Sequence, residues 1–333
     1  FDAYRIATAA WLAAADVHVG EPPALPATAL PLLGRALSEL DLHHPAAAAE
    51  ILAAWSTAPR NAFLDNALLD AQEAAHQTLP MQNTSEAAAN AFKDDHSPLG
   101  SELHARALSA TGPDDATLRT LENALRDFPR DPALALLDAQ TLAADGEGDR
   151  ALALLKHYVA SDDQDARAWF LLGRTSIQQG QAQPAVDEYL VRALVLDTRA
   201  RDAAGEAETR NALGVGYERL GQLDAAAEQY ERAATMREKL GDKPGFSKSL
   251  RNLAIVQAVL GKRDLAERTL DRAKAVLEGL GDRASLADLA NDRGAVAEER
   301  GDFAAAFASY REALVLRQQL DVPDLVAESL DNV

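Results

Sequence analysis

The feature that most constrains this chain is a set of small and aromatic residues that recurs with a period of about 40 residues. The same residue types return at matching offsets in three consecutive stretches of residues 207–320: Gly221, Ala226, Tyr230 and Ala233; Gly261, Ala266, Leu270 and Ala273; Gly301, Ala306, Tyr310 and Ala313. A fixed period in this range is typical of stacked supersecondary units, and it outweighs any local motif. The sequence therefore predicts a repeat architecture.

Each unit is predicted to be two helices joined by a tight turn. Within each half, apolar and small residues lie three and four positions apart, which forms one face of an amphipathic helix. Gly221 can adopt the left-handed conformation that ends a helix, and Asp224 lies where a carboxylate favours the start of the next one. Only 5% of the residues are aromatic, which argues against a sheet. Since one helix pair leaves an apolar face uncovered, the pairs are expected to stack into an all-α solenoid.

Two stretches carry a more specific residue pattern. The first contains Leu213, Gly214, Tyr217, Ala226, Tyr230 and Ala233, and the second contains Trp169, Leu172, Gly173, Gly180, Ala185 and Tyr189. This pattern resembles the tetratricopeptide repeat, and the units of about 40 residues are similar to the longer repeats of kinesin light chain. The resemblance implies a right-handed α-α superhelical solenoid without enzymatic activity. It also implies that the first helix of each pair lines a concave groove that binds extended peptides or partner helices.

The repeat spacing divides the chain into three predicted regions. Residues 1–97 are expected to form a degenerate, tetratricopeptide-like helical region. Residues 98–199 are expected to hold three units of the 34-residue form, with turns at Gly112, Gly146 and Gly180. Residues 200–333 are expected to hold three units of about 40 residues and a truncated fourth.

Three irregularities interrupt this scheme. The pattern degrades over residues 76–98, where a boundary or an irregular repeat is expected, and Arg192-Ala193-Leu194 carries one residue more than the repeat requires. The chain begins at Phe1 and stops at Val333 inside the first helix of a unit, so we expect it to be a piece of a longer protein.

Composition excludes several classes of function. The formal net charge is −19 and the sequence pI is about 4.7, which argues against binding to nucleic acid or to an anionic membrane. Cysteine is absent, so neither disulfides nor thiol chemistry is expected. No run of about 18 apolar residues is present, so this fragment is not expected to insert into a membrane.

Three local patterns suggest chemistry, and none supports it. Gly214-Val215-Gly216 lacks both a preceding strand and a correctly placed third glycine. Asp145–Asp149 resembles the start of a calcium loop, but Lys156 stands at position twelve, where a glutamate is needed. His43-His44 and Glu50 lack the spacing that puts two imidazoles on one helix face. The sequence therefore predicts no catalytic residue, no metal ligand and no cofactor.

The candidate site is the concave groove. In the kinesin-light-chain-like subset of the resembled family, an asparagine of the first helix binds the backbone of the peptide, and its amide offers the donor and the acceptor that a peptide bond requires. Asn252 and Asn332 match that position, Asp292 replaces it in the third unit, and Asn211 and Asn291 lie one residue earlier. Further groove residues expected on the first helices are Val215, Arg219, Lys248, Arg251 and Ile255. Acidic residues are expected in the same row in the first and third units, namely Glu208, Glu218, Asp288, Glu298 and Glu299. Together these residues predict a mostly acidic channel in which the second unit is basic and apolar.

The leading hypothesis is a non-enzymatic scaffold that binds a protein or peptide with basic residues in this groove. The alternative is a sensory or regulatory region of a larger bacterial receptor, such as a membrane-anchored Ser/Thr kinase or a winged-helix regulator. An enzyme of unrecognised type is a third hypothesis. The excess of arginine over lysine and the high alanine content suggest a bacterial source, and the compartment is left open between cytoplasm and periplasm.

Overall fold

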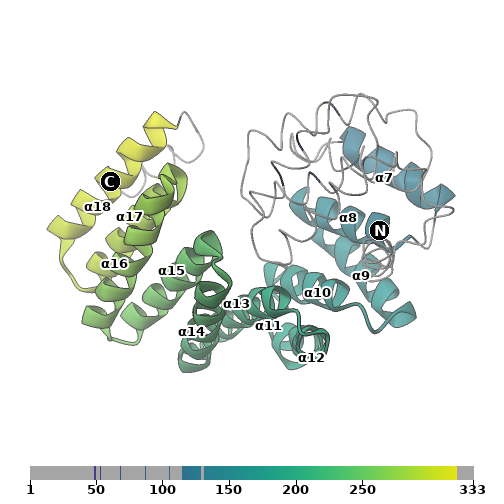
Figure 1. Cartoon of the computed structure of the whole chain (residues 1–333), viewed down its shortest axis with the longest axis horizontal. Helices are drawn as coiled ribbons and strands as arrows, with labels where there is room; N and C mark the ends of the chain where they lie inside the picture. Colours follow the sequence, from purple (N-terminus) through teal and green to yellow (C-terminus); the bar gives the residue numbers. More distant parts are fainter. Residues whose placement is uncertain are drawn as a thin grey trace, which may run out of the picture. The chain divides into compact units, whose positions relative to one another are not determined.

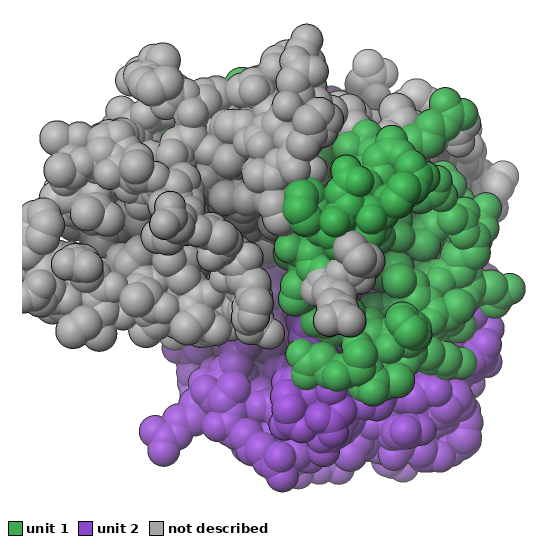
Figure 2. Space-filling model, turned by 90° about the vertical axis from the view of Figure 1, so that its right-hand side faces the viewer, with its two compact units in different colours: residues 1–162 green, residues 163–333 purple. Residues whose placement is uncertain are grey.

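The computed structural model describes residues 115–128 and 131–320, together with the isolated helical residues Ala49, Ala53, Leu68, Ala87 and Ala105. Apart from these isolated residues, the predicted region 1–97 and the irregular segment 76–98 lie outside the described residues, as does Asn332. All regular structure in residues 115–128 and 131–320 is helical, without a strand, which confirms the all-α prediction. The chain forms two compact units, residues 1–162 and 163–333, which Figure 2 colours separately.

The described part of the first unit is a run of three helices. They are α7 (Asp115–Asp127), α8 (Pro132–Ala144) and α9 (Gly148–Ser161). The α8 helix begins where the sequence favours a start: Asp131 accepts a hydrogen bond from the Leu134 backbone nitrogen at 3.1 Å, and Pro132 occupies the first turn. Leu121 and Leu134 are fully buried between α7 and α8.

Asp138 is a buried carboxylate in the middle of α8, and its Oδ1 has no hydrogen-bond partner among the residues that the structure describes. Burial raises the pKa of Asp138 to about 6, while Arg150 opposes the rise and Glu122 adds to it. The folded state therefore holds this proton at a pH at which the unfolded chain has lost it. The consequence is that Asp138 reduces stability progressively as the pH rises from about 4 to above 6.

Asp138→Asn is therefore expected to flatten part of the pH dependence of unfolding. From pH 5 to pH 7.5, the free energy of unfolding of the wild type should fall by about 1 kcal/mol more than that of the variant. The stabilising effect of the substitution is therefore larger at the higher pH. Urea unfolding of both proteins at the two pH values measures this difference. The exposed Asp127, replaced by Asn, is the matched control. Parallel pH profiles for Asp138→Asn and the wild type would contradict the expectation.

The second unit is a longer series of helix pairs (Figure 1). Its first pair joins α10 (Ala166–Gln178) to a composite helix made of α11 (Ala182–Pro184), the π-helical turn η1 (Ala185–Tyr189) and α12 (Leu190–Ala200). A π-helical turn accommodates one extra residue in a helix. It thus explains how the additional residue seen in the sequence near Arg192 fits without ending the helix.

Three further helix pairs follow with closely matched boundaries. They are α13 (Ala203–Arg219) with α14 (Leu223–Leu240), α15 (Lys243–Val259) with α16 (Arg263–Leu280), and α17 (Arg283–Glu299) with α18 (Phe303–Gln319). Figure 1 shows each pair as a hairpin beside the next one. The helices stack in chain order, and together with the comparisons reported below this confirms a solenoid of helix pairs.

The same capping residues set the helix boundaries in each pair. Asp202, Asp242 and Asp282 each accept a hydrogen bond from the backbone nitrogen three residues later, at 2.9, 2.8 and 3.0 Å. The turn between α13 and α14 passes through Gly221, whose φ of 72° favours glycine. These residues recur at offsets of 40 residues, which is the period of the sequence pattern.

Candidate functional site

The first helices of the second unit are α10, α13, α15 and α17, and polar side chains link each to the next. Arg167 of α10 pairs with Glu208 of α13 at 2.8 Å. Ser249 of α15 donates to Asn211 Oδ1 of α13 at 3.1 Å. Arg251 Nε of α15 pairs with Asp292 Oδ2 of α17 at 2.5 Å. We call the surface that these four helices present the first-helix face.

A row of charged residues with alternating sign crosses the first-helix face. One residue at each equivalent position contributes to it: Arg167, Glu208, Lys248 and Asp288. The pKa of Lys248 is lowered, first by partial desolvation and then by Arg237, whereas Glu208 opposes the change. A cationic group thus lies between two carboxylate-bearing helices, and the row offers both signs of charge to a ligand.

Arg251 and Asp292, both predicted groove residues, are engaged with each other. The Arg251 side chain is 20% exposed and that of Asp292 is 13% exposed. Burial raises the pKa of Asp292, and the nearby Arg251 guanidinium opposes that rise. Arg317 of α18 adds an ion pair to Asp288 at 3.1 Å. These charges therefore join α15, α17 and α18, and only part of their hydrogen-bonding capacity is open to a ligand.

The predicted asparagines differ in how accessible they are. Asn211 is buried, and its Oδ1 accepts from Ser249 and, at 3.5 Å, from the Nδ2 of Asn252. Asn291 is half-buried and has a polar partner within the chain. Asn252 is half-buried, and its amide oxygen has no hydrogen-bond partner in the described part of the chain. Among these side chains, Asn252 is best placed to bind a peptide backbone.

The remaining predicted residues are distributed over α13 and α15. Val215 and Ile255 are half-buried at equivalent positions, and Val215 packs against the cluster that contains Tyr230. Lys248 is exposed near the start of α15, and Arg219 is exposed in the last turn of α13. The face therefore has apolar side chains in the middle of its helices and charged ones nearer the ends.

The contribution of α10 to the first-helix face was not predicted from the sequence. Phe170 is buried between two guanidinium groups, with Arg167 5.0 Å and Arg174 5.7 Å from its ring centroid. The Nε of Arg174 is buried, and none of the described residues forms a hydrogen bond with it. Arg174 follows Gly173 as Val215 follows Gly214, so the repeat register contained the signal. The two arginines make this end of the face basic, in addition to the acidic channel expected from the sequence.

Two further observations concern chemistry and membranes. Within the described ranges, no three histidine, cysteine or carboxylate side chains come close enough together to hold a metal ion. No helix in the same residues combines the length and apolarity needed to cross a bilayer.

Comparison with known proteins agrees with this architecture. Residues 107–175 and residues 207–240 each match a family model described as tetratricopeptide repeat. A chain in the crystal structure of the APC/C hetero-tetramer Cut9–Hcn1 superposes with a TM-score of 0.63 and 17% identity, covering 96% of this chain and 59% of that one. BtubC (BKLC) from P. vanneervenii gives a TM-score of 0.51 and 18% identity, covering 71% of this chain and 92% of its own. No curated protein matches the sequence.

The stacked helix pairs and their exposed first-helix face define a solenoid that acts through surface contacts. The matched models identify tetratricopeptide repeats in residues 107–175 and 207–240, and the fold is the helix-pair solenoid that such repeats form. Repeats of this family support a role as a protein–protein interaction scaffold. The identities to the two solved structures are below a quarter, so those structures show the fold and do not specify a partner.

Proposed function

We propose that this protein binds an extended peptide segment of a partner on its first-helix face, without catalysing a reaction. The observation that carries the proposal is the amide oxygen of Asn252, which has no partner within the described residues and lies between the exposed Lys248 and the half-buried Ile255 on α15. An amide can pair with a peptide bond, a cation can pair with an acidic side chain, and an aliphatic side chain can pack against an apolar one. The carboxylates Glu208 and Asp288 on the flanking helices already pair with Arg167 and Arg317, but they stay partly exposed and can also accept from basic residues elsewhere in the peptide.

The alternative, a sensory or regulatory region of a larger receptor, requires the same binding step. A receptor region would transmit the binding of a partner, whereas a scaffold would only hold it. The experiment below therefore tests the step that the two functions share.

Peptide selection on the full chain tests the proposal. Peptides from a displayed random library that bind the wild type should bind Asn252→Ala and Lys248→Ala at least fivefold more weakly, because each variant removes one polar contact on α15. Fluorescence polarisation with the selected peptides gives the affinities. Lys239→Ala, at an exposed position of the second helix α14, is the matched control and should bind as the wild type does. Undiminished binding by both α15 variants would exclude this face.

Arg251→Ala is a poorer probe of binding. Removing the guanidinium would leave the carboxylate of Asp292 half-buried without its ion-pair partner. Loss of binding in that variant could therefore result either from a local change of structure or from the loss of a ligand contact.

A further inference from the structure

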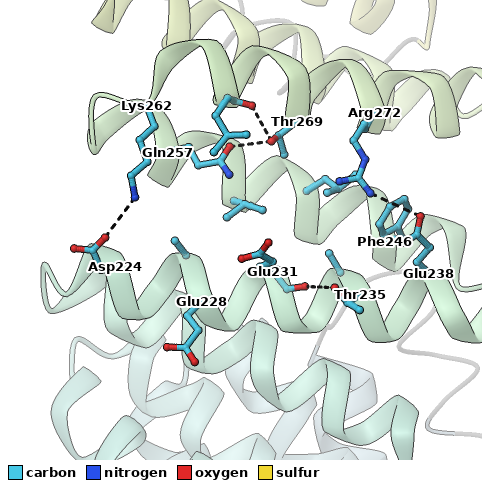
Figure 3. A pocket seen from close by; sticks show the side chains of 15 residues that line it. Asp224, Glu228, Glu231, Thr235, Glu238, Phe246, Gln257, Lys262, Thr269 and Arg272 are labelled. Carbon is cyan, nitrogen blue, oxygen red and sulfur yellow. Dashed lines mark hydrogen bonds and ion pairs between the residues drawn. The ribbon is translucent and has the colours of Figure 1, made fainter.

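A groove runs between the second helices α14 and α16, with α15 as its floor (Figure 3). It belongs to the second layer of helices, apart from the first-helix face residues discussed above. The floor is apolar and buried, with Phe246, Leu250 and Leu253 of α15 exposed by 7%, 1% and 6%. We call it the α14–α16 groove.

Ion pairs bridge the α14–α16 groove only near its ends. Lys262 reaches Asp224 at 3.6 Å at one end, and Arg272 reaches Glu238 at 3.7 Å at the other, where it also lies over the Phe246 ring. Both ion pairs are exposed. They delimit a central section in which cations from α16 do not neutralise the carboxylates of α14.

The central section carries two glutamates of α14. Glu228 pairs with Arg232 on its own helix at 2.5 Å, and Glu231 has no cationic partner among residues 115–128 and 131–320. Figure 3 shows the Glu231 carboxylate rising from α14 into the groove. A carboxylate beside a buried apolar floor is complementary to a cationic side chain that carries an aliphatic stem.

A second, independent observation comes from Gln257 on the floor. Gln257 is buried, with an exposure of 7%. Its Oε1 accepts a hydrogen bond from the Thr269 hydroxyl at 2.9 Å. The Thr269 hydroxyl, which has one proton, lies equally close to the Leu265 carbonyl. The amide nitrogen of Gln257 points into the groove and has no acceptor in the described chain. This nitrogen can therefore donate a hydrogen bond to a carbonyl that a ligand supplies.

The neighbouring groove between α16 and α18 lacks both features. Asp271 takes the position of Glu231 there, and Arg293 pairs with it at 2.5 Å. Ala297 takes the position of Gln257. Among the described residues, the carboxylate of Glu231 without a cationic partner and the amide nitrogen of Gln257 without an acceptor therefore occur in the α14–α16 groove and not at the equivalent positions between α16 and α18. They are not a general consequence of the repeat.

We propose that the α14–α16 groove is a second docking site, which binds a partner peptide segment that carries lysine or arginine beside apolar residues. The cation of that segment pairs with Glu231, its apolar side chains cover Leu250 and Leu253, and one of its backbone carbonyls accepts from Gln257. This site is independent of the peptide site proposed on the first-helix face.

Synthetic peptide pools test the site on the full chain. Fluorescein-labelled nine-residue pools, each with a fixed central Arg, Lys, Glu or Leu, are titrated with the protein and followed by fluorescence polarisation. The Arg and Lys pools should bind more tightly than the Glu pool. Glu231→Gln should weaken the Arg pool at least tenfold, and Gln257→Ala at least threefold. Thr269 can still donate to Leu265 in the second variant, so the fold should be retained.

Asp271→Asn is the matched control, because it removes one carboxylate from the same layer of helices and should leave binding unchanged. It separates docking from the general attraction of basic peptides to a chain of net charge −19. Equal binding of the Arg pool by Glu231→Gln and the wild type, or equal binding of the Glu and Arg pools, would overturn the proposal. Loss of the Arg pool in Asn252→Ala alone would also overturn it, and would assign the binding to the first-helix face.

Discussion

Gly214→Ala is expected to lower the free energy of unfolding by about 3 kcal/mol, the upper range for overpacking a core. A Cβ atom at this position would lie 2.5 Å from Cε1 of Tyr230. That ring cannot move aside easily, because Tyr230 is fully buried and its hydroxyl donates to Glu218 at 2.8 Å. The loss outweighs the gain of about 1 kcal/mol that alanine has over glycine in a helix interior.

The middle repeat shows how the clash can be relieved. The set Gly214, Glu218 and Tyr230 returns as Gly294, Glu298 and Tyr310 in the last pair, but the pair between them has Ala254, Ala258 and Leu270. Leucine there is fully buried beside alanine. The smaller side chain leaves the room that the extra methyl group needs, so the repeats vary these positions together.

Gly214→Ala combined with Tyr230→Leu should therefore recover most of the lost stability. Urea unfolding, followed together with hydrogen exchange of α13 and α14, measures the local effect in a repeat array that does not unfold as one unit. Gly279→Ala is the control, because a Cβ atom there meets nothing within 4 Å. A single variant as stable as the wild type, or a double variant no better than the single, would contradict this account.

The fold was predictable because its determinants are local and repeated. Gly221 ends a helix through its own backbone conformation, and Asp202 caps one through a bond to a residue three positions away. Both features depend on a few adjacent residues. Because the chain repeats these residues, a single sequence contains the same helix-end signals several times. The π-helical turn η1 was only partly predictable: the extra residue is visible in the sequence, but the form that absorbs it depends on packing.

The candidate site was less predictable, because accessibility depends on contacts between repeats. The register places Asn211 and Asn252 on first helices but does not show that Ser249 buries one of them in a hydrogen bond. Arg251 and Asp292 have opposite charges at positions 41 residues apart, and their pairing depends on how α15 crosses α17. The unpartnered amide of Gln257 likewise results from three-dimensional packing. The peptide-binding role of these residues remains a prediction.

Arg237 is a buried cation that joins α14 to α15. Its Nη1 donates to the Gly245 carbonyl at 2.9 Å and to Ser249 Oγ at 3.0 Å, and its Nε lies 3.5 Å from Asp242. Burial lowers the pKa of Arg237, and Asp242 opposes this change. The guanidinium therefore donates two hydrogen bonds to acceptors of α15 at the junction between two repeats.

Arg237→Leu is expected to cost about 3 kcal/mol, because the half-buried Gly245 carbonyl and the buried Ser249 hydroxyl both lose the hydrogen bond from the guanidinium. The next junction has leucine at both equivalent positions, Leu277 and Leu289, which are buried in one apolar cluster. Transferring that arrangement as Arg237→Leu with Ser249→Leu should recover at least half of the loss. Recovery is expected to be incomplete, since Asn211 then loses the hydrogen bond from Ser249.

A double-mutant cycle of Arg237→Leu and Ser249→Leu measures this coupling, with urea unfolding as the readout. Arg232→Leu is the control, because its exposed ion pair with Glu228 contributes at most about 1 kcal/mol. If the two substitutions were simply additive, the arginine and the serine would not form one unit. Coupling in the expected direction would show that a junction between repeats is stable with either of two residue pairs, arginine with serine or leucine with leucine. It would also show that a junction with one residue from each pair is less stable.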